Sequence, residues 1–113
     1  MPVPLRGEVW DMDFGTTRGH ETRGWRPALV LSVDVFNRSP AALAIVLPCT
    51  TKDKGVPLHV RIDPPEGGLS AISYVKVEDI RSLSLERLGR RRGEVSPETM
   101  VDIEERIQDL LDL

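Results

Sequence analysis

Alternation of apolar and polar residues predicts a first β-strand close to the N-terminus. Residues 7–14 read Gly-Glu-Val-Trp-Asp-Met-Asp-Phe. In an extended chain, side chains two positions apart share a face, so Trp10, Met12 and Phe14 fall together. These are the larger side chains of the segment, and we expect their face to pack into the core.

Further apolar segments continue this pattern along the chain. Residues 25–32 and 42–47 are predicted as the second and third strands. The third is apolar nearly throughout, which is typical of a strand buried on both faces. Residues 57–62 alternate, and residues 69–80 are again strand-like. The Pro- and Gly-rich run at 63–68 separates these two segments as a break.

Helical signals gather at the C-terminus. Ser96 is a suitable N-cap, Pro97 fits the first helical position, and Glu98 favours the positive end of the helix dipole. The apolar residues that follow recur at helical spacing, which predicts an amphipathic helix packed on the body. They are Met100, Ile103, Ile107, Leu110 and Leu111.

Three short segments complete the prediction of local structure. Residues 33–40 are expected to form a connection with a short helical turn. Residues 82–88 are expected to form a short helix anchored by leucines. The basic run Arg90-Arg91-Arg92-Gly93 is expected to be a solvated turn.

These elements amount to five or so short strands and one terminal helix. Over 113 residues this pattern predicts a single domain spanning 1–113. The expected fold is mainly β with a C-terminal helix, in which a small, strongly bent, barrel-like sheet is capped by that helix.

The single cysteine and the N-terminal sequence bear on the cellular compartment. Cys49 has no partner for an internal disulfide. Residues 1–6 lack the layout of a signal peptide, and no apolar run is long enough to cross a bilayer. We therefore expect a cytoplasmic protein that does not bind membranes. Since a small cysteine in a strand is usually buried, Cys49 is not expected to be a nucleophile.

The net charge of −3 conceals a division between the two parts of the chain. Residues 94–113 hold seven acidic side chains and one basic side chain, a net charge of −6. Residues 1–93 hold 14 basic and 11 acidic side chains, a net charge of +3. Twelve of the fifteen basic residues are arginine, whose planar fork of donors fits phosphate oxygens. A mildly basic body is compatible with a nucleic-acid partner despite the overall sign.

Residues that could bind a phosphate lie where the predicted second and third strands meet the loops. Arg26 opens one apolar segment, and Thr50 ends the other. On neighbouring strands the two side chains would meet at the rim of the sheet, where a guanidinium beside a hydroxyl can hold a phosphate. The polar loop Gly15–Gly24 is expected to be long and mobile and to deliver charge to this rim, or else to be a solvated hairpin tip.

The sequence lacks the residue patterns that other types of reaction need. His20, Cys49 and His59 do not show the paired spacing of a zinc site, and no glycine-rich phosphate loop is present. We expect neither a metal nor a cofactor. Arginines, hydroxyls, a loop histidine and a loop carboxylate suit phosphodiester cleavage in RNA, in which the 2′-hydroxyl attacks the neighbouring phosphate.

Three motifs together resemble the MazF/PemK toxin endoribonucleases. They are Gly7-Glu8-Val9-Trp10, Arg26-Pro27-Ala28-Leu29-Val30-Leu31-Ser32 and Pro48-Cys49-Thr50-Thr51-Lys52. The later Asp79-Ile80-Arg81-Ser82 and Leu88-Gly89 are also similar to segments of that family. The likeness runs in order over nearly the whole chain. Each motif is weak alone, and the set is specific.

The resemblance implies an SH3-like barrel with a C-terminal helix, a homodimer, and a cognate acidic MazE-like antitoxin peptide. It implies sequence-specific, metal-independent cleavage of single-stranded RNA to 2′,3′-cyclic phosphate and 5′-hydroxyl ends. Arg26 and Thr50 match the catalytic pair, and Glu21 matches a loop carboxylate of some members. His59 matches a substrate-side position of some members. The residues expected to contact RNA are Arg18, His20, Thr51, Lys52 and His59.

Two points stay open at the level of sequence. The family often has glutamine where this chain has Asp79, and an acid there is expected to repel phosphate and alter base selection. Arginine is a poor general base because its pKa lies above about 12. We expect Arg26 to stabilise the transition state with Thr50 as a further donor, and the base is left open.

A second class of function fits the same fold. SH3-like toxins that poison DNA gyrase bind a protein target and cut no nucleic acid. The pair Arg26 and Thr50 favours the nuclease, because a binding module has no need of it. Appearance of discrete fragments from a long RNA would discriminate between the two.

Overall fold

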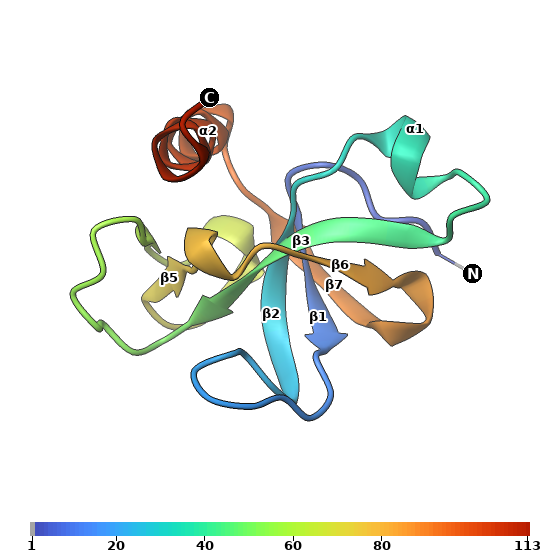
Figure 1. Ribbon diagram of the computed structural model, residues 1–113, viewed down its shortest axis with the longest axis horizontal. Helices are drawn as coiled ribbons and strands as arrows, with labels where there is room; N and C mark the ends of the chain where they lie inside the picture. Colours follow the sequence, from blue (N-terminus) through green and yellow to red (C-terminus); the bar gives the residue numbers. More distant parts are fainter. Residues whose placement is uncertain (1) are drawn as a thin grey trace.

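The fold is organised around one long central strand (Figure 1). A computed structural model describes residues 2–113. Strand β3 (Leu43–Thr50) pairs with β2 (Trp25–Val30), and β2 pairs with β1 (Glu8–Asp13). Strand β7 (Leu88–Glu94) follows on the outer edge of β1. All of these pairings are antiparallel.

The opposite edge of β3 serves two partners in succession. Its first half pairs with β6 (Arg81–Ser84), and its last two residues pair with β5 (Ser73–Val75). Strand β4 (Val60–Ile62) extends the sheet beyond β5. Because one strand exchanges partners along its length, the sheet bends into a half-barrel (Figure 1). The prediction of a mainly β fold with a C-terminal helix is confirmed.

Apolar side chains fill both faces of β3. Leu47 and Cys49 join a cluster with Val9, Leu29 and residues of β4 and β5. Ala44 and Val46 join a second cluster, which contains the predicted core face of β1. That face consists of Trp10, Met12 and Phe14. The alternation confirms that the third strand is buried on both faces.

Helix α2 (Pro97–Leu111) begins where the sequence predicts, since Ser96 Oγ accepts from the Thr99 amide at 3.2 Å. Met100, Ile103 and Ile107 pack against the core cluster of the sheet, and Ile103 is fully buried. Leu111, near its end, is 50% exposed. Only part of the predicted apolar stripe therefore packs on the body. The short helix α1 (Asp34–Asn37) is the helical turn expected within residues 33–40.

The prediction of a short helix over residues 82–88 is wrong. Strand β6 covers its beginning, a 3-10 turn η3 (Leu85–Arg87) follows, and β7 begins at Leu88. Pairing with the edge of β3 outweighs the local preference.

The basic run Arg90–Arg92 lies within β7 and is not a turn. Two carboxylates on the adjacent strand β1 form ion pairs with it. Arg91 Nε lies 2.5 Å from Glu8 Oε2, and Arg92 Nη1 lies 3.0 Å from Asp11 Oδ1. These cross-strand ion pairs cannot be recognised from residue spacing alone, because the partners lie on different strands.

The predicted strand at 69–80 is mostly irregular. Only β5 is extended, and a 3-10 turn η2 (Val77–Asp79) follows it. The chain turns here because β5 and β6 pair with different parts of the same strand edge. A further 3-10 turn η1 (Glu66–Gly68) approaches β7 so closely that a Cβ on Gly68 would lie 1.9 Å from the Arg92 carbonyl oxygen.

Candidate functional site

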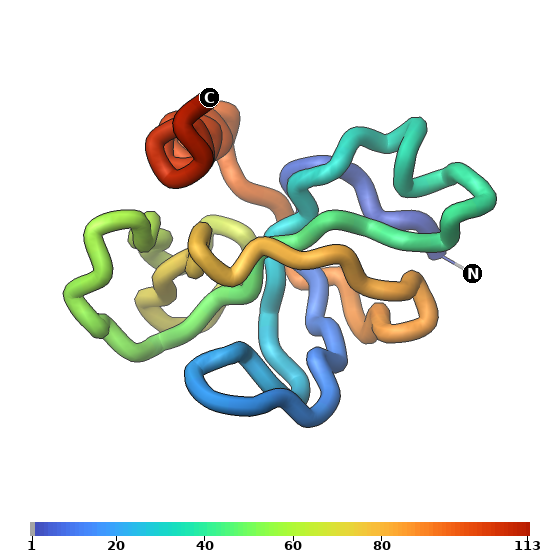
Figure 2. The backbone as a smooth tube through the Cα atoms, viewed as in Figure 1, coloured from blue at the N-terminus to red at the C-terminus, as the bar shows by residue number. Residues whose placement is uncertain are grey.

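Arg26 and Thr50 come together at the end of the β2–β3 pair. The last residues paired between these strands are Ala28 and Pro48, and Arg26 and Thr50 each lie two residues beyond them, on the wall of one pocket. Beyond this point the two strands diverge toward the loops at 15–24 and 51–59 (Figure 2).

A pocket of about 250 Å³ opens at this point. Arg26 and Thr50 form part of its wall, and the loop Gly15–Gly24 supplies another part. The remaining lining residues come from the end of β3, the loop after it and the segment after β5. The full lining is Gly19, His20, Glu21, Thr22, Arg23, Arg26, Cys49, Thr50, Lys52, Lys54 and Lys76.

The pocket concentrates positive charge. All three lysines of the chain line it, together with Arg23 and Arg26, against a single carboxylate, Glu21. Within residues 2–113, no salt bridge is formed by Arg23, Arg26 or the two lysines of the 51–59 loop, Lys52 and Lys54. The arginines of β7 are paired with Glu8 and Asp11. Four cations of the pocket are therefore available to an anion, whereas the fifth, Lys76, is paired with Asp79.

The hydroxyl of Thr50 is oriented by the backbone. Its Oγ1 accepts from the Lys52 amide at 3.2 Å, which leaves the hydroxyl hydrogen free to donate. Cys49, next to it, is buried, and burial raises the pKa of its thiol to about 12. A protonated, buried thiol is a poor nucleophile. The prediction that Cys49 is a buried structural cysteine is confirmed.

A second pocket of about 150 Å³ adjoins the first. The two share Arg26, Cys49, Thr50 and Lys52. The second is completed by Pro27, Thr51 and Ser73. The structure thus gathers Thr51 and Lys52, two of the residues expected to contact RNA, around the expected catalytic pair.

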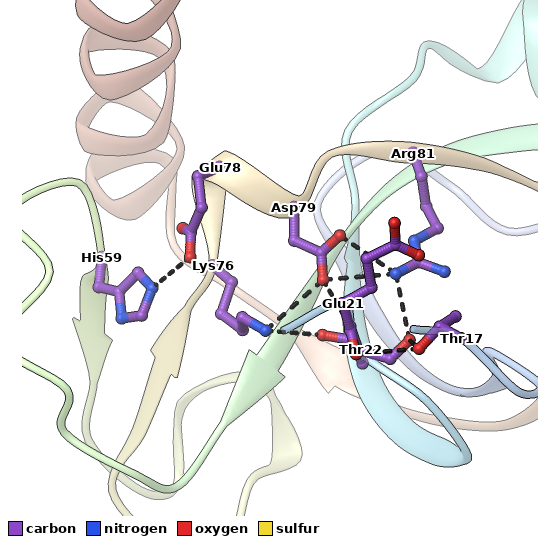
Figure 3. Close-up of polar contacts among 8 residues, drawn as sticks. All are labelled: Thr17, Glu21, Thr22, His59, Lys76, Glu78, Asp79 and Arg81. Atoms are coloured by element: carbon purple, nitrogen blue, oxygen red, sulfur yellow. Dashed lines mark hydrogen bonds and ion pairs between the residues drawn. The ribbon is translucent and has the colours of Figure 1, made fainter. Parts of the chain in front are cut away.

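Two other expected contact residues lie on the loop above. His20 lines the main pocket, and Arg18 lies in a neighbouring depression with His20 and Glu21. His59 lines neither of the two adjoining pockets. Its side chain is only 4% exposed, and its Nε2 lies 2.9 Å from Glu78 Oε2 (Figure 3). A substrate could reach this imidazole only after that pair separated.

Comparison with known proteins places the chain in a family. The sequence model for the PemK-like, MazF-like toxins of type II toxin–antitoxin systems matches residues 5–111. The chain belongs to the PemK/MazF toxin family. Its relatives include an endoribonuclease MazF9 of Mycobacterium tuberculosis, 34% identical over 113 residues and 96% of both chains.

Solved structures agree with this placement. A MazF from Deinococcus radiodurans superposes with a TM-score of 0.88 at 28% identity, over 100% of both chains. An endoribonuclease from a mycobacterial species, solved in complex with its cognate antitoxin, gives a TM-score of 0.79 at 32% identity over 100% of this chain and 97% of that one. The fold of this PemK/MazF toxin and its class as an endoribonuclease are thereby shown.

In the structure of this toxin, Asp79 does not have the phosphate-repelling role that we expected from the sequence. Its carboxylate lies 3.1 Å from Arg81 Nη2 and 3.5 Å from Lys76 Nζ, so its charge is matched by two cations. Burial tends to raise the pKa of Asp79, but hydrogen bonds from Thr22 and Arg81 outweigh it and lower the pKa below its ordinary 3.8. Asp79 is an internal ion-pair partner rather than a free charge facing phosphate.

Sequence reasoning missed Lys54 and Lys76 as pocket residues. A signal for Lys76 existed, because it is a lone cation within the apolar run 72–77 and would have to be paired or functional there. Among residues 2–113, no three side chains of His, Cys, Asp or Glu gather as potential metal ligands. In the same part of the chain, no helix has both the length and the apolar character needed to cross a membrane.

Proposed function

We propose that the Arg26–Thr50 pocket is where this toxin endoribonuclease cuts single-stranded RNA, without a metal. The products are a 2′,3′-cyclic phosphate and a 5′-hydroxyl. One observation carries the proposal: cations without carboxylate partners, Arg26 foremost, surround an oriented hydroxyl in a pocket. A phosphodiester carries the opposite charge, and its oxygens match these donors.

The reaction uses donors aimed at one phosphate. The 2′-oxygen of the substrate attacks the neighbouring phosphorus, and the bond from phosphorus to the 5′-oxygen breaks. Negative charge grows on the non-bridging oxygens in the transition state. The guanidinium of Arg26 and the hydroxyl of Thr50 stabilise that charge more strongly than they stabilise the substrate. The guanidinium of Arg26 donates a proton to the leaving 5′-oxygen, and the proton of the attacking 2′-hydroxyl goes to the general base.

Glu21 is assigned to accept the proton of the 2′-hydroxyl. It is the one carboxylate on the pocket wall within the described residues 2–113, and its side chain is exposed. Arginine, with its very high ordinary pKa, cannot take that proton near neutral pH. Placing one carboxylate among several cations lets a phosphate bind and still leaves a base at the site.

The partners follow from the same charge layout. Relatives solved with a cognate antitoxin make an acidic, extended antitoxin segment the expected regulator of this chain. Such a segment would pair with Arg18, Arg23 and Arg26, move the loop at 15–24 and close the pocket to RNA. We extend the proposal to a homodimer in the cytoplasm.

The decisive experiment is digestion of a long unstructured RNA in excess EDTA. Discrete fragments are expected. Their 5′ ends should accept label from a polynucleotide kinase without prior dephosphorylation, and their 3′ ends should resist ligation until the cyclic phosphate is removed. Activity that disappears in EDTA and returns with magnesium or manganese would overturn the proposed chemistry. Sequencing the fragment ends would define the recognised bases.

A further inference from the structure

Thr22, within the polar loop Gly15–Gly24, attaches the loop over the pocket to the body. Its amide donates to Asp79 Oδ2 at 3.0 Å. Its carbonyl oxygen accepts from Arg81 Nη2 at 3.1 Å, and its Oγ1 accepts from Lys76 Nζ at 2.9 Å. Each polar atom of Thr22 is thus bound by a different side chain of the body (Figure 3).

The three body side chains come from one short segment around the turn η2. Lys76 precedes the turn, Asp79 ends it, and Arg81 begins β6. They are also tied to each other, because Asp79 pairs with both cations. A buried ion pair is held in one geometry when its remaining donors and acceptors are satisfied. Thr22 supplies one such contact to each of the three side chains.

Arg81 also links this group to the base of the loop. Its guanidinium carbon lies 4.9 Å from the centre of the Phe14 ring. The Phe14 amide donates to the Gly24 carbonyl at 2.8 Å, and the Gly24 amide donates to the Gly15 carbonyl at 2.8 Å. The loop is therefore held both at its base and at Thr22, contrary to the expectation of a freely mobile hairpin.

The residues that attach the loop are buried, whereas the neighbours of Thr22 in the loop are exposed. Thr22 is 8% exposed and Lys76 is 7% exposed. Glu21 and Arg23, on either side of Thr22, are exposed, and both line the pocket with Arg26. Fixing the backbone at Thr22 therefore sets where its two charged neighbours stand relative to the phosphate site.

We propose that Thr22, Lys76, Asp79 and Arg81 form a loop clasp that positions Glu21 and Arg23 over the Arg26–Thr50 pair. Thr22 and Lys76 are positioning residues in this scheme and act on the reaction through Glu21. The proposal rests on the function proposed above. The ionised carboxylate of Asp79 forms ion pairs with two cations at once. A neutral amide at this position would carry no charge to attract them.

The first test measures the loop itself and needs no RNA. Thr22→Val removes the hydroxyl that Lys76 binds, and Lys76→Met removes the ammonium. Trypsin should then cut after Arg18 and Arg23 at least about tenfold faster than in the parent, because a released loop samples open conformations. Cutting after Lys52 and Lys54, in the other loop of the same molecule, should not change. Thr16→Val, exposed in the loop at 15–24, is the matched control.

The second test measures RNA cleavage in the same variants. Thr22→Val should lower kcat on the order of tenfold, with a smaller change in KM, because a misplaced catalytic group costs rate more than binding. Lys76→Arg should recover most of the loss seen in Lys76→Met. In a Glu21→Gln background, Thr22→Val should have little further effect, since it acts through that carboxylate.

The outcomes separate the clasp from the proposed function. Unchanged loop proteolysis in both Thr22→Val and Lys76→Met would overturn the clasp, whatever the RNA result. Additive losses in the Glu21→Gln, Thr22→Val double variant would overturn its positioning role. If the loop opens in these variants as expected but the parent protein cuts no RNA, the proposed function is overturned and the clasp is supported.

Discussion

Arg26 and Thr50 line each of two adjoining pockets from opposite strands of one antiparallel pair. A phosphate held between them would leave space on both sides for the nucleotides that it joins. The strand pair is rigid because Ala28 and Leu47, a few residues inward, are fully buried. The backbone that carries both side chains is therefore in place before any substrate arrives, which lowers the cost of reorganisation in the proposed reaction.

Arg26→Ala should lower RNA cleavage by roughly a hundredfold or more, because it removes the principal donor to the developing charge. The fold should persist, since Arg26 is exposed at the rim of the sheet. Initial rates on a defined RNA, with thermal unfolding as a check, test this. Arg90→Ala is the control, because that side chain is 76% exposed on β7 and outside the pocket. Parental rates in Arg26→Ala would show that the site is assigned wrongly.

Binding of RNA should weaken as salt increases. Each phosphate contact with a single strand contributes a slope of about −0.7 to log K against log salt. Lys52→Gln should therefore reduce the magnitude of the slope by about 0.7. Fluorescence anisotropy with a 2′-O-methyl oligonucleotide measures binding without cleavage. Arg90→Gln should leave the slope unchanged, and an equal effect of both substitutions would contradict a localised phosphate site.

Asp79→Asn should destabilise the protein by about 1–3 kcal/mol at neutral pH, because it breaks a mostly buried, charge-assisted network. The folded-state pKa of Asp79 lies below its ordinary 3.8, so folding favours the ionised form. This stabilisation is fully present above the ordinary pKa and is lost as pH falls through the lower, folded-state pKa. Urea unfolding from pH 7 to pH 3 should show the difference between parent and variant shrinking only at the acid end.

A surface carboxylate provides the comparison for that experiment. Asp63 pairs with Arg61 at 2.7 Å, but its side chain is 64% exposed. Asp63→Asn should leave the free energy of unfolding nearly unchanged, because exposed ion pairs contribute little. Equal destabilisation by both substitutions would mean that the network around Asp79 has no special role in stability.

Ile103→Ala should destabilise the fold by about 2–5 kcal/mol, the usual cost of a large cavity in a packed core. Ile103 is the fully buried anchor of α2. Leu111→Ala, at a half-exposed position on the same helix, should change stability by less than about 0.5 kcal/mol. Chemical denaturation of the two variants compares them directly. Equal losses would show that the helix packs along its whole length.

The sequence by itself determined the features that depend on neighbours along the chain. Alternation fixed β1 and its core face, the run of apolar residues fixed β3, and the Ser96–Pro97 signals fixed the start of α2. The motifs around Arg26 and Thr50 identified the family and the expected catalytic pair. These features follow from side-chain periodicity and from the local chemistry of helix ends, which operate over a few residues.

Only the tertiary structure decided which charges are free and which are neutralised. Arg90–Arg92 look available in sequence but pair with β1, whereas Lys54 and Lys76 are inconspicuous and line the pocket. Asp79 looks like an intruding acid, yet it anchors Thr22, which lies 57 residues away along the chain. Ion pairing depends on distances of a few ångströms between distant segments, and those distances exist only once β3 has gathered its partner strands.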